Sequence, residues 1–397
     1  MSYNLNIVGG GMVGASLALA LQGCAQQAGW TVRLIEAHPP SKGGWQPSYD
    51  NRSTALSHSS RRLFERLGIW SDLARRAEPI CQIHVSDRGH PGSVRMTAAE
   101  EGVPALGYIV ENAWLGEVLL KNLDHQVIEW LAPARVEKAQ AQTDGYLLDV
   151  QMPNGNQQLM SDLLIVADGG RSGLLDQLGI HRKVSPYQQV AVIANVTTAK
   201  GHSGVAYERF TDTGPLALLP LSGQRSALVW TLAEDAAADI AQLPDEQFLE
   251  RLQAAFGFRM GALTRVGVRN TYPLSLIEAQ EQVRPHLVVL GNAAHSLHPI
   301  AGQGFNLSLR DAMALADNLQ QAQREQRHPG TLSVLQGYLD SQHGDQMATV
   351  AFSHYLTRLF SNQNSLLVAG RNAGLMALDL LPPLKTRLAR QGMGLRG

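Results

Sequence analysis

The sequence predicts an α/β protein in which a domain built on a parallel sheet is interrupted by a β-rich segment and followed by helices. Three observations support this class. A glycine-rich turn links a strand to a helix near the start of the chain. Strand-like stretches fill residues 187–233, and apolar strands that resemble the opening strand return near residues 163 and 287. With 397 residues, the chain is long enough to form two or more domains.

The first element is a short apolar strand, Leu5–Val8, followed by a turn and a helix. The turn carries glycines in the spacing G-x-G-x-x-G, at Gly9, Gly11 and Gly14. The first permits a tight turn, the second lets a pyrophosphate approach the backbone, and the third lets the helix pack closely on the strand. A second strand, Thr31–Ile35, ends at Glu36, where a carboxylate suits ribose hydroxyls. This fingerprint predicts a bound dinucleotide, either NAD or FAD.

The same stretch has an alternative interpretation as an export signal, because its apolar run ends at Cys24 in a poor lipoprotein-like box. An export signal needs positive charge before the apolar run, and the first Lys or Arg is Arg33. Three consecutive glycines, Gly9–Gly11, would also interrupt it. No stretch has the roughly 18 uninterrupted apolar residues of a membrane span. The sequence therefore favours the nucleotide-binding interpretation.

The rest of the chain alternates between helical and strand patterns. Apolar spacing predicts helices over residues 61–76, 113–123 and 245–256, and beyond residue 308. Strands are expected over residues 79–110, 126–166, 187–233 and 287–290. We assign the nucleotide domain to residues 1–75, 106–180 and 276–345, a substrate domain to 76–105 and 181–275, and a helical region to 346–397. Simple dehydrogenases keep this domain contiguous, so the interruption favours a flavoprotein.

Charge and cysteine content exclude several functional classes. The net charge of −1 gives no basic field for nucleic acid. The two cysteines, Cys24 and Cys81, form neither a disulfide framework nor a metal pattern, and the histidines have no ligand spacing. We therefore expect a cytoplasmic protein with no metal site.

Two further motifs follow apolar strands. Asp168 begins an Asp-Gly turn after residues 163–166, at a strand end where ligands collect in α/β sheets; an ordinary turn is the alternative. The third motif spans residues 289–312, where His298-Pro299 forces an extended turn. Gly302-Gln303-Gly304 then opens a helix whose N–H groups suit the negative charge of a reduced flavin. Within it, His295 and His298 are expected to be structural hydrogen-bonding residues.

These three motifs, in this order and spacing, resemble the class A flavin monooxygenases, the aromatic hydroxylases of the para-hydroxybenzoate hydroxylase type. The resemblance covers essentially the whole chain. Further stretches are similar to the ubiquinone-biosynthesis hydroxylases: residues 50–56, 208–210, 214–220 and 298–307. Residues 84–90 and 190–196 resemble the branch of that family that acts on 2-polyprenyl-6-methoxyphenol.

The resemblance implies FAD as cofactor, NAD(P)H as reductant and O₂ as co-substrate. It implies hydroxylation of a polyprenylated phenol to a 1,4-benzenediol through a flavin C4a-hydroperoxide. The implied cofactor-binding residues are Gly9, Gly11, Gly14, Glu36, Arg52, Asn112, Asp168, Asn292, Gly302, Gly304 and Asn306. Gly302, Gly304 and Asn306 would face the flavin ring. No catalytic base is identified.

Candidates for the substrate pocket are Tyr207, Phe210, Arg225 and Pro299. Tyr207 and Phe210 lie on a strand expected to face the active site, with core packing as the alternative. For Arg225 the alternative is a surface arginine at the start of a strand. The chain departs from the family pattern at Asn292, where Asp is usual, and at Leu175, where Arg is usual. The second departure weakens the case for an NADPH contact at that motif.

Three other functions remain open: a sister hydroxylase acting at another ring position, a flavin-bearing scaffold for partner subunits, and a plain NAD(P) dehydrogenase. The end of the chain bears on partners. Helical spacing at Leu356, Leu359 and Phe360 is expected to break over residues 370–375.

A basic cluster follows at Lys385, Arg387, Arg390 and Arg396. It is either a solvated tail or a segment that collects the tailed substrate from the inner membrane or from a lipid-binding or sister biosynthetic protein. On the second hypothesis, deletion of residues 384–397 is expected to spare turnover of a short-tailed phenol.

Overall fold

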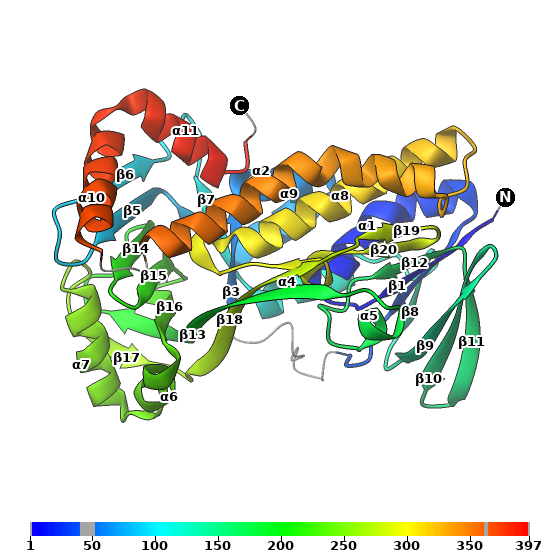
Figure 1. Cartoon of the computed structure of the whole chain (residues 1–397), viewed down its shortest axis with the longest axis horizontal. Coiled ribbons are helices and arrows are strands. Elements are labelled where there is room, and N and C mark those ends of the chain that lie inside the picture. The colour runs from blue at the N-terminus through cyan, green and yellow to red at the C-terminus, as the bar shows by residue number, and fades with distance from the viewer. Residues whose placement is uncertain (1, 40–51, 361–363, 396–397) are drawn as a thin grey trace.

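The structure is a computed structural model that describes residues 2–39, 52–360 and 364–395. Three residues used in the sequence analysis, Asp50, Asn51 and Arg396, lie outside this part of the chain. A parallel sheet occupies one end of the molecule and a large, mostly antiparallel sheet the other, with two long helices running past both (Figure 1). The predicted α/β class, with its β-rich interruption and helical C-terminal region, is confirmed.

The parallel sheet has six strands in the order β19-β20-β12-β1-β2-β8. Their bounds are β1 (Asn4–Val8), β2 (Thr31–Ile35), β8 (Ile128–Leu131), β12 (Leu163–Val166), β19 (Val283–Arg284) and β20 (Leu287–Val289). All neighbours are parallel except the edge pair β19–β20. Segments far apart in sequence thus bring their carboxyl ends to one edge, where ligands bind in such sheets.

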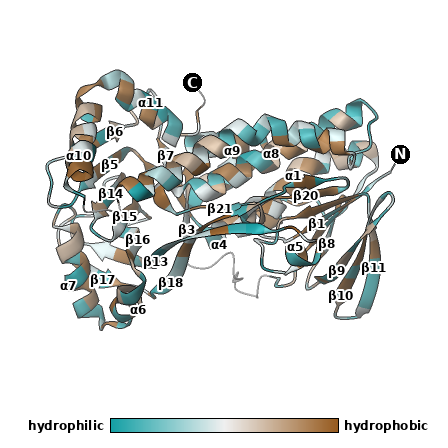
Figure 2. Cartoon of the chain, in the orientation of Figure 1, coloured by the Kyte–Doolittle hydropathy of each residue, from teal (hydrophilic) through white to brown (hydrophobic). Residues whose placement is uncertain are grey.

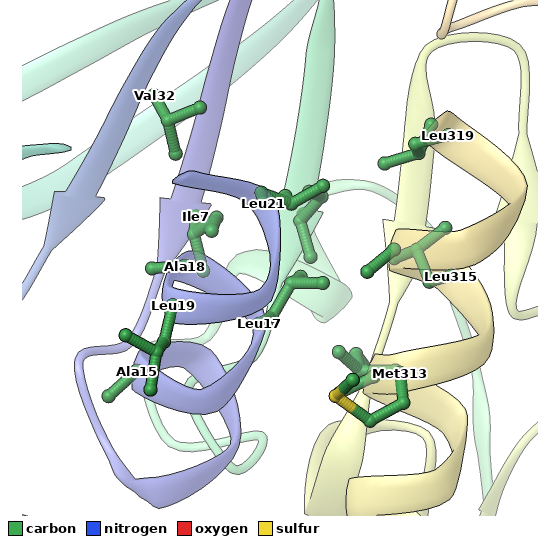
Figure 3. Packing of buried hydrophobic residues seen from close by; sticks show 14 of the residues in the cluster. Ile7, Ala15, Leu17, Ala18, Leu19, Leu21, Val32, Met313, Leu315 and Leu319 are labelled. Carbon is green, nitrogen blue, oxygen red and sulfur yellow. The ribbon is translucent and has the colours of Figure 1, made fainter. Parts of the chain in front are cut away.

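Helix α1 (Met12–Ala28) packs between this sheet and helix α8 (Gln303–Arg324). Figure 3 shows Leu17 and Leu21 of α1 beside Leu315 and Leu319 of α8. All four side chains are fully buried, and each contributes about 1.5–3 kcal/mol by leaving water. Helix α9 (Leu332–Phe360) lies along α8. This packing fixes the start of α8 relative to the glycine turn before α1.

Two small sheets flank the parallel sheet. One contains β9 (Arg135–Gln142), β10 (Gly145–Met152) and β11 (Gly155–Ser161). The other contains β3 (Ser53–Ser57), β4 (Ala77–Ile80) and β7 (Gly107–Glu111), and β7 leads into α4 (Asn112–Lys121). The single helix expected over residues 61–76 is instead divided into α2 (His58–Arg66), α3 (Trp70–Leu73) and a 3₁₀ turn η1 (Ala74–Arg76). Gly68, with φ +77°, ends the first of these.

The large sheet has nine strands, ordered β21-β18-β13-β16-β15-β14-β5-β6 with β17 paired to β13. Their bounds are β5 (Gln82–Asp87), β6 (Ser93–Thr97), β13 (Arg182–Thr198), β14 (Val205–Thr211), β15 (Gly214–Pro220), β16 (Arg225–Ala233), β17 (Leu263–Val266), β18 (Asn270–Ala279) and β21 (His295–Ser296). Helices α6 (Glu234–Gln242) and α7 (Asp245–Phe256) cover one face. Because side chains alternate along strands, the other face is left to line a cavity.

The C-terminal region forms helices α10 (Ser365–Leu380) and α11 (Pro382–Gly392), which pack near β6 (Figure 1). The expected break over residues 370–375 is wrong, because α10 continues through it. Its two polar residues there, Arg371 and Asn372, are buried and bonded to Asp87, which stabilises this turn. The break comes instead at Pro382-Pro383, where prolines begin α11. No helix in the described ranges is long and apolar enough to cross a membrane.

Candidate functional site

One large cavity lies between the two main sheets and joins the three sequence motifs. Its volume is about 1200 Å³, above the roughly 300–1,000 Å³ typical of small-molecule pockets. One end is formed by the carboxyl ends of β1, β2 and β12, and the other by the open face of the large sheet together with α10 and α11. The cavity therefore has room for a dinucleotide and for a second, apolar ligand.

The glycine turn forms the floor of the first end. Gly9 has φ +107°, and a Cβ there would lie 2.5 Å from the Ala167 carbonyl oxygen. A Cβ on Gly14 would lie 2.0 Å from the Gly9 carbonyl oxygen. Gly11 caps α1 without a side-chain hydrogen bond and lines the cavity with Val13. The turn thus presents a helix N-terminus at close range, which suits an anionic pyrophosphate.

Glu36 lies beside this turn at the end of β2 and is 9% exposed. Its Oε2 accepts a hydrogen bond from the Gly10 N–H at 2.7 Å, and its Oε1 accepts one from the His38 N–H at 2.8 Å. Each carboxylate oxygen can accept a further bond, and the side chain lines the cavity. Glu36 therefore fixes the turn and retains capacity for a ribose hydroxyl.

Asp168 closes the turn after β12. Its Oδ1 accepts from the Gly170 N–H at 2.8 Å, and its Oδ2 accepts from the Ser172 N–H at 3.0 Å and from the Ser172 hydroxyl. Asp168 also lines the cavity, so the turn and ligand interpretations are compatible. Leu175, on the short helix α5 (Leu174–Gln177), is buried in the core. The position where the family usually carries Arg thus offers no polar group to a ligand.

Arg52, Thr54 and Asn112 form a second wall between the sheets. The Asn112 Oδ1 accepts a hydrogen bond from the Thr54 hydroxyl at 2.7 Å, and the Asn112 N–H donates to the Arg52 carbonyl at 2.9 Å. The Arg52 guanidinium lies 4.9 Å from the ring centroid of Tyr272 on the large sheet. All four residues line the cavity. This wall places the Arg52 guanidinium where the nucleotide-binding end of the cavity meets the end formed by the large sheet.

The third motif follows β20 and begins with a 3₁₀ turn, η2 (Gly291–Ala293), in which Asn292 is exposed and lines the cavity. After a second 3₁₀ turn, η3 (Ile300–Gly302), α8 begins. Gly302 has φ +61°, and a Cβ there would lie 2.7 Å from the Ala55 Cβ. Gly302, Gly304 and Pro299 all line the cavity. The start of α8 therefore faces the same space as the start of α1.

Asn306 is placed differently from the expectation that it faces the flavin. Its side chain is 1% exposed and is absent from the cavity lining. Its Oδ1 accepts from the Ser57 N–H at 2.9 Å and the Ser60 hydroxyl at 2.6 Å. Its Nδ2 donates to the Ala55 and Gly302 carbonyls at 2.8 and 2.7 Å. With these four bonds Asn306 holds the start of α8 against β3 and its following helix.

The two histidines of the motif are buried. His295 Nε2 lies 2.7 Å from Asp311 Oδ2, and His298 contacts the Tyr187 ring edge-on at 5.2 Å between centroids. Burial lowers the pKa of His298 to about 4, so its imidazole is neutral at physiological pH. His298 Nδ1 also accepts a hydrogen bond from the Ile300 N–H at 3.3 Å. Among the described residues, no group of three His, Cys, Asp or Glu could hold a metal ion.

The structure separates the candidates for the substrate pocket. Phe210 lines the cavity and stacks on Phe360, with ring centroids 3.6 Å apart. Tyr207 is also among the lining residues, but its ring packs on Phe256 of α7, on the helix-covered side of the sheet, because positions 207 and 210 have opposite parity on one strand. Arg225 is not in the lining, and its Nη1 lies 3.0 Å from Glu111 Oε1. Arg225 therefore does not face the cavity, and the packing of the Tyr207 ring favours the core role that was its alternative.

Sequence reasoning missed two parts of the cavity wall. One is Glu208, an acidic residue on the cavity face of β14. The only signal in the sequence was that Glu208 lies two positions before Phe210, and so on the same face of the strand as that apolar residue. The other is the C-terminal end: Leu366, Leu367 and Leu375 of α10 and Leu388 of α11 line the cavity. Residues 384–392 are thus not a separate solvated tail, because they belong to α11, which forms part of the wall.

Comparisons with known proteins identify the family and the fold. The profile of the family described as "FAD binding domain" matches residues 3–342. The chain is 36% identical to the ubiquinone hydroxylase UbiL of Rhodospirillum rubrum, over 98% of this chain and 89% of that one. It is 32% identical to the 3-demethoxyubiquinol 3-hydroxylase of Escherichia coli, over 98% of both. The fold matches the p-nitrophenol 4-monooxygenase PnpA of Pseudomonas putida with a TM-score of 0.79 at 18% identity, covering 100% of this chain and 99% of the other.

Proposed function

This chain belongs to the FAD binding domain family and is an FAD-dependent aromatic monooxygenase, and from this premise we propose that it hydroxylates a polyprenylated phenol in ubiquinone biosynthesis. The proposed substrate is 2-polyprenyl-6-methoxyphenol, and the product is the corresponding 1,4-benzenediol. The names of the two relatives support the pathway. The observation that carries the proposal is the continuity of the large cavity, which joins the nucleotide-binding edge of the parallel sheet to an apolar chamber.

The residues present fit FAD. A Cβ on Gly9 or Gly14 would meet backbone oxygen atoms of the turn itself and of Ala167 after β12, so these glycines keep the turn and the start of α1 tight enough for a pyrophosphate to approach the backbone at Gly11. Glu36 would hold the adenosine ribose, Arg52 the phosphates or the ribityl chain, and Asn292 the ribityl hydroxyls. When bound, FAD reduced by NAD(P)H activates O₂ and supplies the oxygen atom that enters the ring.

The apolar chamber would bind the phenol. Its floor carries alternate side chains of the large sheet, among them Val85, Ile193, Ala217 and Val229. Such a lining excludes water from the oxygen-donating centre and holds the ring close to it. Phe210 and Phe360, stacked on each other, close the chamber towards the C-terminal helices. The chain's own contribution is thus to bind the phenol, to orient its ring and to keep water out of the chamber.

The C-terminal helices would receive the polyprenyl tail. Leu366 and Leu367 line the cavity and are also 84% and 46% exposed, so the apolar wall continues to the surface. Figure 2 shows hydrophobic residues along α10 at the end of the molecule away from the parallel sheet. Leu380, Leu381 and Leu384 add to this exposed surface. We define these five leucines as the C-terminal apolar surface.

The basic residues of α11 support a lipid bilayer as the source of the polyprenyl tail. Arg387 and Arg390 on α11 are exposed, and each basic residue near an anionic membrane contributes roughly 1 kcal/mol. Asp379 is the one acidic residue within α10 and α11. Peripheral contact of these helices with the inner membrane would let the tail enter the cavity without crossing water.

The experiment that tests the function is mass spectrometry of the quinone intermediates that accumulate in cells lacking the protein. Accumulation of 2-polyprenyl-6-methoxyphenol supports the proposal, whereas a precursor lacking a different ring oxygen supports a sister hydroxylase. A purified yellow protein that oxidises NAD(P)H only with added phenol, and forms the benzenediol, contradicts the scaffold and dehydrogenase alternatives. Flavin without any such turnover would favour the scaffold.

A further inference from the structure

Glu208 lies on the cavity face of β14. Alternation along this strand points Ala206, Glu208 and Phe210 into the cavity. The intervening Tyr207 packs on the other side, edge-on to His84 and Phe256 at 5.6 and 5.5 Å between ring centroids. The Glu208 carboxyl therefore projects into the apolar chamber assigned to the substrate.

The surroundings of Glu208 are apolar. Val85 of β5 and Ala217 of β15 flank it in register, and Val229 of β16 follows Ala217 on the same face. The nearest charged residue on that face of β5 is Asp87, two positions beyond Val85. Asp87 is paired with Arg371 and accepts a further bond from Asn372. No cation in the described structure is thus directed at Glu208.

Glu208 differs in this respect from the other acidic residues of the cavity lining. Glu36 and Asp168 each accept backbone N–H bonds. Glu208 has neither a hydrogen bond nor an ion pair within residues 2–39, 52–360 and 364–395. The Glu208 side chain is half-buried, and a carboxyl group that faces an apolar chamber without a partner costs stability once water leaves that chamber. Residues kept at such a cost are candidates for function.

Burial alone raises the pKa of Glu208 from 4.5 to about 7. A carboxyl with a pKa near physiological pH is present in both protonation states and can exchange a proton with little driving force in either direction.

On the basis of the proposed function, we propose that Glu208 binds the phenol hydroxyl of the substrate and takes its proton during hydroxylation. The O–H bond of the phenol breaks and an O–H bond forms on the carboxylate, with no change in oxidation state. The phenolate electrons then increase the nucleophilicity of the para carbon, which receives the oxygen atom. When that carbon loses its own proton to water and the ring regains aromaticity, the electrons of the C–H bond return the original oxygen to a phenolate, and Glu208 gives its proton back to that oxygen.

The test compares a short-tailed 2-prenyl-6-methoxyphenol with its O-methyl ether, which lacks the hydroxyl. Dissociation constants are measured on the FAD-loaded protein from the change in flavin absorbance. We expect the wild type to prefer the phenol by roughly ten- to a hundredfold, as a hydrogen bond to a charged group provides. Glu208→Leu should remove this preference. An unchanged preference in Glu208→Leu would overturn the assignment.

Glu208→Gln separates binding from proton transfer, because the amide can accept the hydroxyl bond but cannot take the proton. We expect phenol affinity within a few-fold of wild type, a hydroxylation rate reduced about a hundredfold or more, and continued NAD(P)H oxidation that releases hydrogen peroxide. If Glu208→Gln hydroxylates the phenol at the same rate as the wild type, the proposal is contradicted. Because Gln matches Glu in shape, this arm is decisive even if the Leu variant fails to fold.

Val85→Ala is the matched control, since it alters the same patch of the chamber floor without an ionisable group. It should weaken the phenol and the ether equally and leave their ratio unchanged. A ratio that falls as far in Val85→Ala as in Glu208→Leu would show that packing, rather than the carboxylate, sets the preference. If the wild type turns over no phenol at all, the proposed function fails, and the role of Glu208 fails with it. If it turns over phenol and the variants match it, only the role of Glu208 fails.

Discussion

Arg371 and Asp87 form a buried ion pair that joins the C-terminal helix α10 to strand β5. Arg371 Nε lies 2.8 Å from Asp87 Oδ2, and the two side chains are 5% and 2% exposed. Asn372 Nδ2 donates a further bond to the same carboxylate at 2.8 Å. Arg371 also lines the cavity. The pair therefore holds the helical wall of the cavity on the large sheet.

Breaking this pair should destabilise the protein strongly. Arg371→Met leaves the Asp87 carboxylate buried with only neutral partners, which typically costs about 3–5 kcal/mol. The free energy of unfolding in urea measures this. The matched control is Arg66→Met, because Arg66 pairs with Asp317 at the exposed surface, where a pair contributes about 0–1 kcal/mol. Equal losses in both variants would contradict the role of burial.

Gly11→Val should abolish retention of FAD, because a branched side chain would occupy space that the pyrophosphate needs. The control is Gly23→Val in the same helix, where a Cβ meets no heavy atom within 4 Å. The flavin absorbance of each purified, folded protein is the measurement. Normal flavin content in Gly11→Val would contradict the assignment of the glycine turn.

Asn292→Asp should retain FAD and part of the activity, because either side chain can accept a hydrogen bond from a ribityl hydroxyl. Asn292→Ala should bind FAD more weakly, by ~1–3 kcal/mol if the hydroxyl is left unpaired. Titration of the apoprotein with FAD gives the three affinities. Identical affinities for Asn, Asp and Ala would show that position 292 does not contact the cofactor.

Glu208 should make the stability of the wild type fall with rising pH. Its pKa is raised from 4.5 to about 7 by burial, so the folded state holds a proton that the unfolded chain releases. The resulting stabilisation is full below pH 4.5 and is lost as pH rises through 7. Relative to Glu208→Gln, the wild type should lose ~1–3 kcal/mol between about pH 5 and about pH 8. Parallel urea-unfolding profiles for the two proteins would refute this.

The C-terminal apolar surface should be needed for membrane binding but not for chemistry. Leu380→Ser with Leu384→Ser removes two exposed leucines, 75% and 47% exposed, that are not part of the cavity lining. We expect weaker co-sedimentation with anionic vesicles and unchanged turnover of a short-tailed phenol. Phe258→Ser, at a residue 71% exposed near α7, is the control and should bind vesicles normally. Equal binding by all three proteins would exclude this surface.

Leu380→Ser with Leu384→Ser is a sharper test of how the tailed substrate reaches the cavity than deletion of residues 384–397. The deletion would remove Leu388, Ala389 and Met393, which line the cavity, as well as the Lys385–Glu100 ion pair at 2.8 Å. A loss of activity after the deletion would therefore report damage to the wall rather than failed delivery of the tail.

The sequence by itself determined the parts of this protein that depend on local pattern. Backbone constraints limit Gly9 and Gly14 to glycine, and apolar runs bounded by turns identify β2 and β12 with the bounds observed. The family resemblance implied that Glu36, Asp168 and the start of α8 belong to one cofactor site, and the carboxyl ends of the parallel strands bring them to one cavity. The family resemblance rests on these same local features.

Only the tertiary structure decided which side chains face the cavity. Asn306 belongs to the third motif, yet its four bonds turn it away from the cavity, and Tyr207 lies on the face covered by α7. Helix α10 continues past residues 370–375 because Asp87, distant in sequence, satisfies its buried polar groups. Such partners come from contacts between residues distant in sequence, which the spacing of residues along one helix or strand cannot predict. In the same way, Glu208 becomes a candidate only when the folded sheet shows that nothing in the described structure pairs with it.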